Sequence, residues 1–173
     1  MSSTEGFFLH ASSVDIDGRV VMFMGHSSAG KSTISRLLSP RYPIVADDKV
    51  WVSLREPGEW IAADAIDWLL AERTRVSPRR HQFVNQLPVL AVARIFKSET
   101  NQIQPLNPKE TCRFLLDGVF EVDTQRLNTD IACRKRWFSL VARFSREVQG
   151  WRLTFRKDNS ILTLITEVFG ISN

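Results

Sequence analysis

The sequence predicts an α/β fold in which a phosphate-binding loop joins a buried strand to a helix. The first observation is the P-loop (Walker A) pattern Gly-x-x-x-x-Gly-Lys-Ser over residues 25–32. The second is its setting, because an apolar run, 19–24, precedes the pattern and apolar residues at helical spacing, 31–38, follow it. The third is that strand-like and helix-like segments alternate along the rest of the chain, as in α/β proteins.

The bulk composition is that of a folded domain. The chain has 173 residues, 43% of them hydrophobic, with no internal repeat or Gly/Ser-rich linker, so we expect one domain over 1–173. Its formal net charge of +4 favours acidic partners such as a nucleotide, a phosphorylated substrate or an acidic protein surface. The two cysteines, Cys112 and Cys133, lack zinc-site spacing and indicate partly buried thiols in a reducing compartment.

The sequence shows no sign of export or membrane insertion. The first residues lack the basic start and apolar run of a signal peptide, and no apolar stretch approaches the length of a membrane span. We therefore expect a cytoplasmic protein without a membrane partner.

A β-hairpin is predicted ahead of the loop. Segments 7–16 and 19–24 are apolar, and Asp17-Gly18 between them is a typical two-residue turn. Continuing the antiparallel register of this turn places His10 opposite Gly25. His10 is therefore expected beside the phosphate loop.

The remaining elements follow from periodicity and from turn residues. A core strand, 42–46, is expected to end at Asp47-Asp48, and a second strand, 50–54, at the turn 56–59. Beyond it we expect a helix over 64–75, a loop over 77–81, a buried strand over 87–96, a short strand over 103–106, a helix from Asn107 to about Phe120, one or two amphipathic helices within 124–148, a strand over 151–155 and a helix over 160–169.

The loop has the residues that a polyphosphate requires. Its glycines allow successive backbone N–H groups to converge on phosphate oxygens, and the helix N-terminus adds positive potential. Lys31 can neutralise the β- and γ-phosphates, and Ser32 can offer its hydroxyl to Mg²⁺. The expected nucleotide-binding residues are Gly25, His26, Ser27, Ser28, Ala29, Gly30, Lys31, Ser32 and Thr33.

Two adjacent carboxylates after a strand suit a magnesium nucleotide site. One of them can hold the cation, directly or through water, and the other can accept the proton of an attacking hydroxyl. Asp47 and Asp48 are the candidates.

These features together resemble the catalytic domain of HPr kinase/phosphorylase, a serine kinase of the phosphoenolpyruvate carboxykinase-like P-loop group. The resemblance rests on His10, Val-Asp-Ile-Asp-Gly at 14–18, the loop 25–32 and Ile-Val-Ala-Asp-Asp at 44–48, in matching order and spacing. It implies a mixed β-sheet core with flanking helices and the use of ATP and Mg²⁺.

The resemblance also implies roles for individual residues. Lys31 would bind phosphate, Ser32 and Asp48 would hold Mg²⁺, and Asp47 would be the leading general base. Asp48 and His10 would act nearby in electrostatic or positioning roles. The division of roles between Asp47 and Asp48 stays open.

The sequence departs from that family in one respect. The later Glu-x-Arg-Gly signature has no counterpart, so we do not expect phosphorylase activity, and recognition of HPr itself is not carried over. The expected function is ATP-dependent transfer of the γ-phosphoryl group to a hydroxyl, foremost a serine of a protein or peptide. The alternatives are a small-molecule kinase of the same fold and a non-catalytic nucleotide-binding regulatory protein.

Basic residues form two further groups. Arg79-Arg80-His81 falls in the loop expected over 77–81, and a cationic stretch including Arg134, Arg143, Arg152 and Arg156 spans the C-terminal third. Either could dock an acidic acceptor, although solvated helix faces explain most of the second group. Nucleic acid is disfavoured because no aromatic-basic interleaving is present. The acceptor's identity, the choice among ATP, GTP and pyrophosphate, and homo-oligomer formation stay open.

Overall fold

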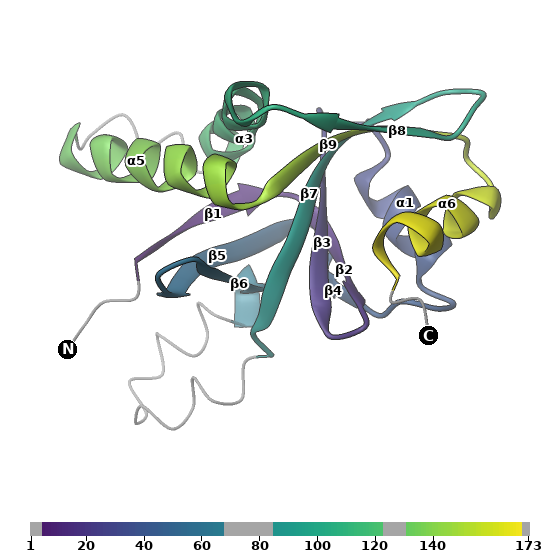
Figure 1. The fold of residues 1–173 in the computed structure, drawn as a ribbon, viewed down its shortest axis with the longest axis horizontal. Coiled ribbons are helices and arrows are strands. Elements are labelled where there is room, and N and C mark those ends of the chain that lie inside the picture. Colours follow the sequence, from purple (N-terminus) through teal and green to yellow (C-terminus); the bar gives the residue numbers. More distant parts are fainter. Residues whose placement is uncertain (1–4, 68–84, 123–130, 171–173) are drawn as a thin grey trace.

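A computed structural model describes residues 5–67, 85–122 and 131–170 (Figure 1). The described strands are β1 (Gly6–His10), β2 (Ser12–Ile16), β3 (Arg19–Met24), β4 (Ile44–Ala46), β5 (Lys49–Glu56), β6 (Glu59–Asp64), β7 (Leu87–Lys97), β8 (Gln102–Leu106) and β9 (Gln149–Phe155). The described helices are α1 (Lys31–Leu38), α3 (Pro108–Val122), α5 (Ile131–Glu147) and α6 (Ser160–Phe169). The predicted α/β fold, a mixed sheet with flanking helices, is confirmed.

Three parallel strands form the centre of the sheet. β7 pairs in parallel with β3 on one side and, through its carboxyl half, with β9 on the other. The other pairings are antiparallel: β2 on β3, β4 on β2, β8 on β9, and the series β1-β5-β6 on the start of β7. The carboxyl ends of β3, β7 and β9 consequently meet at one edge, where α/β proteins usually bind their ligands.

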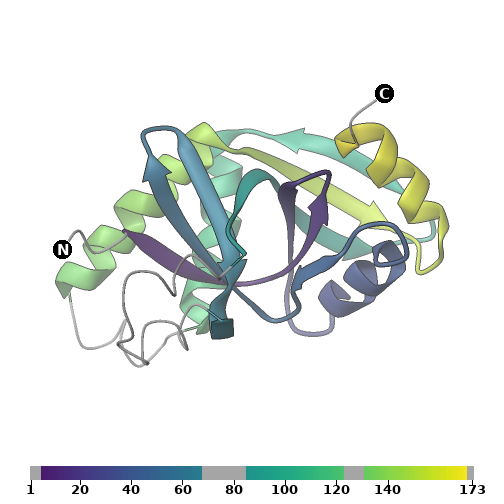
Figure 2. The ribbon, with the colours of Figure 1, turned by 90° about the horizontal axis from the view of Figure 1, so that it is seen from below.

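Two hydrophobic cores lie on opposite faces of the parallel strands. On one face α1 and α6 pack together over Phe23, Ile95 and Leu153. On the other face α3, α5 and the β1-β5-β6 strands enclose Met22, Val92 and their neighbours. Figures 1 and 2 show α1 and α6 together at one end of the molecule and α5 at the other.

An aromatic cluster joins α5 to the antiparallel strands. Phe7, Trp60 and Phe144 pack edge to face, with ring centroids 5.1–6.1 Å apart. The indole N–H of Trp60 donates a 2.7 Å hydrogen bond to Glu147. The hydrogen bond from Arg143 lowers the pKa of Glu147, aided by that from Trp60 and opposed by burial. The charged Glu147 side chain and its two hydrogen bonds therefore lie at the edge of the apolar cluster.

The predicted hairpin is confirmed only between β2 and β3. Asp17 and Gly18 both have positive φ, 52° and 82°, as a type I′ turn requires. The predicted pairing of His10 with Gly25 is wrong, because the chain leaves this hairpin at Ala11, whose N–H donates to the carbonyl of Asp48. His10 ends β1 and pairs with Lys49 of β5 instead.

Other differences concern short or partly described segments. The strand expected over 42–46 is limited to β4, an end strand with Ile44 exposed, and the buried strand β6 was not predicted. Of the helix expected over 64–75 only its start is described, and the loop 77–81 and residues 123–130 lie outside the described ranges. The Asn107 start of α3 is confirmed.

A reciprocal capping box holds that start in place. The N–H of Glu110 donates to the Asn107 side chain at 2.9 Å, and the N–H of Asn107 donates to the Glu110 carboxylate at 3.1 Å. α3 then crosses β9 so closely that a Cβ on Gly150 would lie 2.0 Å from Oγ1 of Thr111.

We expect Gly150→Ala to lower the free energy of unfolding by about 1–3 kcal/mol, because α3 must move away from β9. Urea denaturation measures this loss. Thr111→Ala removes two of the three atoms that the new methyl group meets. The double variant should therefore be less destabilised than the sum of the two single variants, and strict additivity would contradict the close contact.

Candidate active site

The loop between β3 and α1 has the backbone shape of a phosphate cradle. Gly30 has φ +102°, and a Cβ there would lie 2.9 Å from the Phe155 ring. At Gly25 a Cβ would lie 2.7 Å from that of Ala29. Ser28 also has positive φ, and the N–H of Ala29 donates to the His26 carbonyl, which closes the turn. Both glycines are therefore required by the geometry.

Lys31 lies across this loop and is buried. Its Nζ donates to the carbonyl of Gly25 at 2.8 Å and to that of His26 at 3.4 Å. Its own carbonyl accepts from the buried Ser12 hydroxyl, which fixes the start of α1 against β2. Lys31 forms no ion pair with any carboxylate of the described residues, so its charge is compensated only by carbonyl dipoles. An incoming phosphate can satisfy it better.

The opposite wall comes from two chain segments. His10 ends β1, and Asp47 and Asp48 form the connection from β4 to β5. His10 Nε2 lies 3.1 Å from Oδ1 of Asp48, and an Arg36 guanidinium nitrogen lies 4.0 Å from Oδ2 of Asp47. The two neighbouring carboxylates therefore point to different partners.

One open pocket of about 350 Å³ separates the two walls. This volume is within the range of ligand sites, roughly 300–1,000 Å³. Its lining residues are His10, Ser27, Ser28, Gly30, Lys31, Ser32, Thr33, Asp47, Asp48 and Lys97. The predicted catalytic and magnesium residues thus line a single pocket.

The remaining predicted loop residues lie beside it. Gly25 and His26 line a narrow second hollow together with His10, and Ala29 packs against the core beneath α1. His10 borders both hollows, although the register from which its position was predicted is wrong.

The donor set of the pocket suits Mg²⁺ bound with a polyphosphate. No group of three or more His, Cys, Asp or Glu in the described part of the chain could hold a metal by itself. Mg²⁺ commonly uses one or two carboxylates together with phosphate oxygens and water. Ser32 with Asp47 or Asp48 provides hard oxygen donors of this kind.

The comparison with protein families decides the relationship of the chain. The model of the family described as "SynChlorMet cassette protein ScmC" matches residues 1–165. The chain belongs to the ScmC family. No curated protein matches this ScmC-family sequence.

Solved structures also match the chain. The structure titled "Structure of the Hpr(Ser) kinase/phosphatase from Coxiella burnetii" has a TM-score of 0.46 and 16% identity. The match covers 93% of the ScmC-family chain and 92% of the chain in that structure.

Of the helices in the described ranges, none has the length and hydrophobicity that crossing a bilayer requires.

Sequence reasoning missed Lys97 in this ScmC-family site. Lys97 is the exposed last residue of β7, and its Cε would lie 3.3 Å from a Cβ on Gly30. It also borders an adjoining hollow of about 480 Å³ lined by Ser98, Glu99, Phe155, Arg156 and Lys157. The available signal was its position at the end of a buried strand, but the pairing of that strand with β3 was not apparent from sequence.

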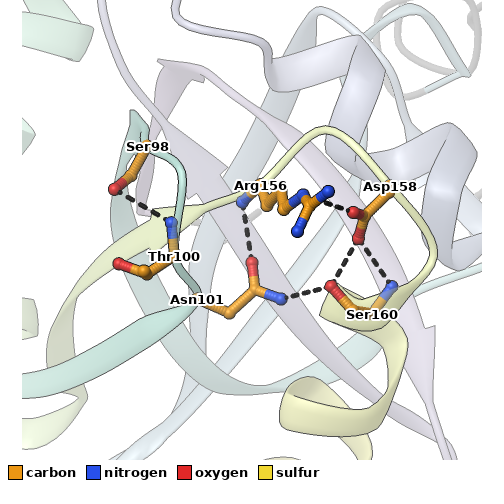
Figure 3. Close-up of polar contacts among 6 residues, drawn as sticks. All are labelled: Ser98, Thr100, Asn101, Arg156, Asp158 and Ser160. Carbon is orange, nitrogen blue, oxygen red and sulfur yellow. Dashed lines mark hydrogen bonds and ion pairs between the residues drawn. The ribbon is translucent and has the colours of Figure 1, made fainter.

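A polar network fixes the two loops beside this adjoining hollow (Figure 3). Asn101 accepts from the Arg156 N–H at 2.7 Å and donates to the Ser160 hydroxyl at 2.7 Å. Asp158 accepts from the N–H and hydroxyl of Ser160 and pairs with Arg156. The Ser160 hydrogen bonds, with Arg156, lower the pKa of Asp158. The β7–β8 turn is thereby joined to the β9–α6 loop.

We expect Gly30→Ala to abolish stabilisation by Mg·ATP, because a methyl group at positive φ displaces Phe155 or the loop. Thermal unfolding of the wild type should show a stabilisation of about 2.7 kcal/mol when nucleotide is at a hundredfold its Kd. Gly58→Ala is the matched control, since Gly58 has φ +85° with no atom within 4 Å of the new Cβ. An equal Mg·ATP response in the two variants would contradict the cradle.

Proposed function

We propose that this chain is an ATP-dependent kinase that transfers the γ-phosphoryl group of Mg·ATP to a hydroxyl, foremost that of a serine in a peptide or protein. The observation that carries the proposal is the single pocket with Lys31 and its loop on one wall and His10, Asp47 and Asp48 on the other. Nucleotide binding alone needs only the first wall. Carboxylates opposite the terminal phosphate supply what transfer to a hydroxyl adds, a proton acceptor.

ATP would occupy the pocket of about 350 Å³ and the adjoining hollow of about 480 Å³. Its phosphates lie on the loop, where Lys31 exchanges the Gly25 carbonyl for phosphate oxygens and stabilises charge on the transferring group. Its nucleoside extends past Lys97 into the hollow beside Phe155. Lys97 borders both spaces and places positive charge between them, which suits a triphosphate tail.

The contacts of the two carboxylates favour different roles for them. Arg36 follows Ser32 by four residues and shares its face of α1. The pairing of Arg36 with Asp47 therefore supports an assignment of Asp47 to the magnesium side. Asp48 is oriented by His10 at the other side of the pocket. We therefore assign proton acceptance to Asp48 and magnesium binding to Asp47, the reverse of the assignment implied by the sequence resemblance.

We expect Asp48→Asn to lower kcat by about a hundredfold or more, because the variant cannot accept the hydroxyl proton. Its affinity for Mg·ATP should change little. Asp47→Asn should instead raise the Mg²⁺ concentration needed for half-maximal activity. Transfer of labelled γ-phosphate to a panel of serine peptides, with Mg²⁺ titrated, measures both effects.

The outcome in these variants also separates the alternatives. If Asp47→Asn loses kcat while Asp48→Asn changes only the Mg²⁺ requirement, the original assignment is correct. Transfer to small hydroxyl compounds but to no peptide identifies a small-molecule kinase. Mg·ATP binding without hydrolysis or transfer to any acceptor identifies a non-catalytic nucleotide-binding protein and overturns the proposal.

A further inference from the structure

Two arginines lie side by side on the sheet near the phosphate loop. Arg94 of β7 and Arg152 of β9 are partners in the parallel register, and Gln104 of β8 follows Arg152 across the next pairing. Paired residues share a face of the sheet. Along β7, Val92 and Phe96 lie on the same face as Arg94, and the residues between them belong to the core of the opposite face. The row of paired residues therefore lies on the face that α3 partly covers.

The Phe96 ring is close to both of these charges. The guanidinium carbons of Arg94 and Arg152 are 5.4 and 4.9 Å from the centre of its ring, within cation–π distance. Neither arginine forms an ion pair with a carboxylate of the described residues. Like charges on neighbouring strands repel each other, which favours the binding of an anion beside the pair. The guanidinium groups suit planar carboxylates, which they can bind in a bidentate manner.

Arg94 connects the arginine pair to the side of the phosphate loop from which we expect the acceptor to approach. Arg94 lines the narrow hollow of about 20 Å³ that also borders His10, Gly25 and His26. His10 in turn orients Asp48, the proposed proton acceptor. Lys97 and the proposed nucleoside hollow lie on the other face of β7, because side chains alternate along a strand. Donor and acceptor would thus approach from opposite faces of the sheet.

Asp117 of α3 adds a constraint at the inner end of this surface. It is exposed and lines the same narrow hollow as Arg94 and His26. Its charge repels carboxylates in this hollow next to the loop, whereas Arg152, on the strand beyond Arg94, attracts them outside it. A segment with an uncharged hydroxyl residue at the loop and acidic residues beyond it fits both charges.

We propose that Arg94, Phe96 and Arg152 form a docking surface for an acidic segment of the peptide or protein acceptor. The proposal rests on the proposed kinase function, since it names the substrate class of that site. The acceptor presents a serine to Asp48 and places Asp or Glu side chains on the two guanidinium groups. Phe96 packs against the apolar part of the segment.

Fluorescein-labelled peptides test the surface by binding, independently of phosphoryl transfer. A central serine is flanked on one side by three Asp or Glu residues, by Gln at the same positions, or by Lys. Fluorescence anisotropy in the presence of Mg·ATP should show about tenfold tighter binding of the acidic peptide than of the Gln peptide. Arg152→Gln should remove that preference, and Arg134→Gln on the exposed face of α5 is the matched loss of charge.

A charge-reversal variant distinguishes loss of the docking surface from loss of the fold. In the double variant Arg94→Glu with Arg152→Glu, binding should shift to the Lys peptide by about tenfold over the acidic one. An unfolded chain cannot gain such a preference. A tighter complex with a labelled single-stranded oligouridylate than with the acidic peptide, lost in Arg152→Gln, would overturn the proposal in favour of nucleic acid.

The remaining outcomes distinguish this proposal from the proposed function. Equal binding of acidic and Gln peptides, or a preference retained in Arg152→Gln, overturns the docking surface and leaves the kinase proposal standing if transfer occurs. Acidic preference that depends on Arg152, without transfer to any peptide or small hydroxyl compound, supports the surface and removes the kinase function.

Discussion

The parallel pairing of β3 with β7 is the constraint on which the other functional features depend. It sets the phosphate loop at the end of β3 beside Arg94 and Lys97 at the end of β7. Only glycine fits at position 25, between the loop and β7, because a side chain there would meet Ala29 and Ile95. The parallel addition of β9 then brings Phe155 against Gly30 and Arg152 beside Arg94. Three strand ends distant in sequence thus form one edge.

The alternation of side chains on β7 divides that edge into two faces. Lys97 and Phe155 border the hollow proposed for the nucleoside, and Arg94 borders the hollow that reaches His10. α3 crosses the second face closely, with Gly150 beneath Thr111, and Arg152 on that face is exposed. In the proposed kinase, donor and acceptor would meet in line by approaching one loop from opposite faces of the sheet.

Local features of the site could be predicted from sequence, and non-local ones could not. The loop 25–32, the Asp17-Gly18 turn and the Asn107 cap depend on residues close in the chain, and the structure has each of them. His10 was placed beside the loop through a hairpin register that the chain abandons at Ala11. The Arg94–Arg152 pair depends on a parallel pairing of distant strands, which no turn residue specifies.

A crystal structure with Mg²⁺ and a non-hydrolysable ATP analogue tests the central claim most directly. We expect Nζ of Lys31 to leave the carbonyl of Gly25 and bind phosphate oxygens, with the terminal phosphate facing Asp48 and the base beyond Lys97. A triphosphate bound elsewhere, or Lys31 still donating to Gly25 beside it, would contradict the account.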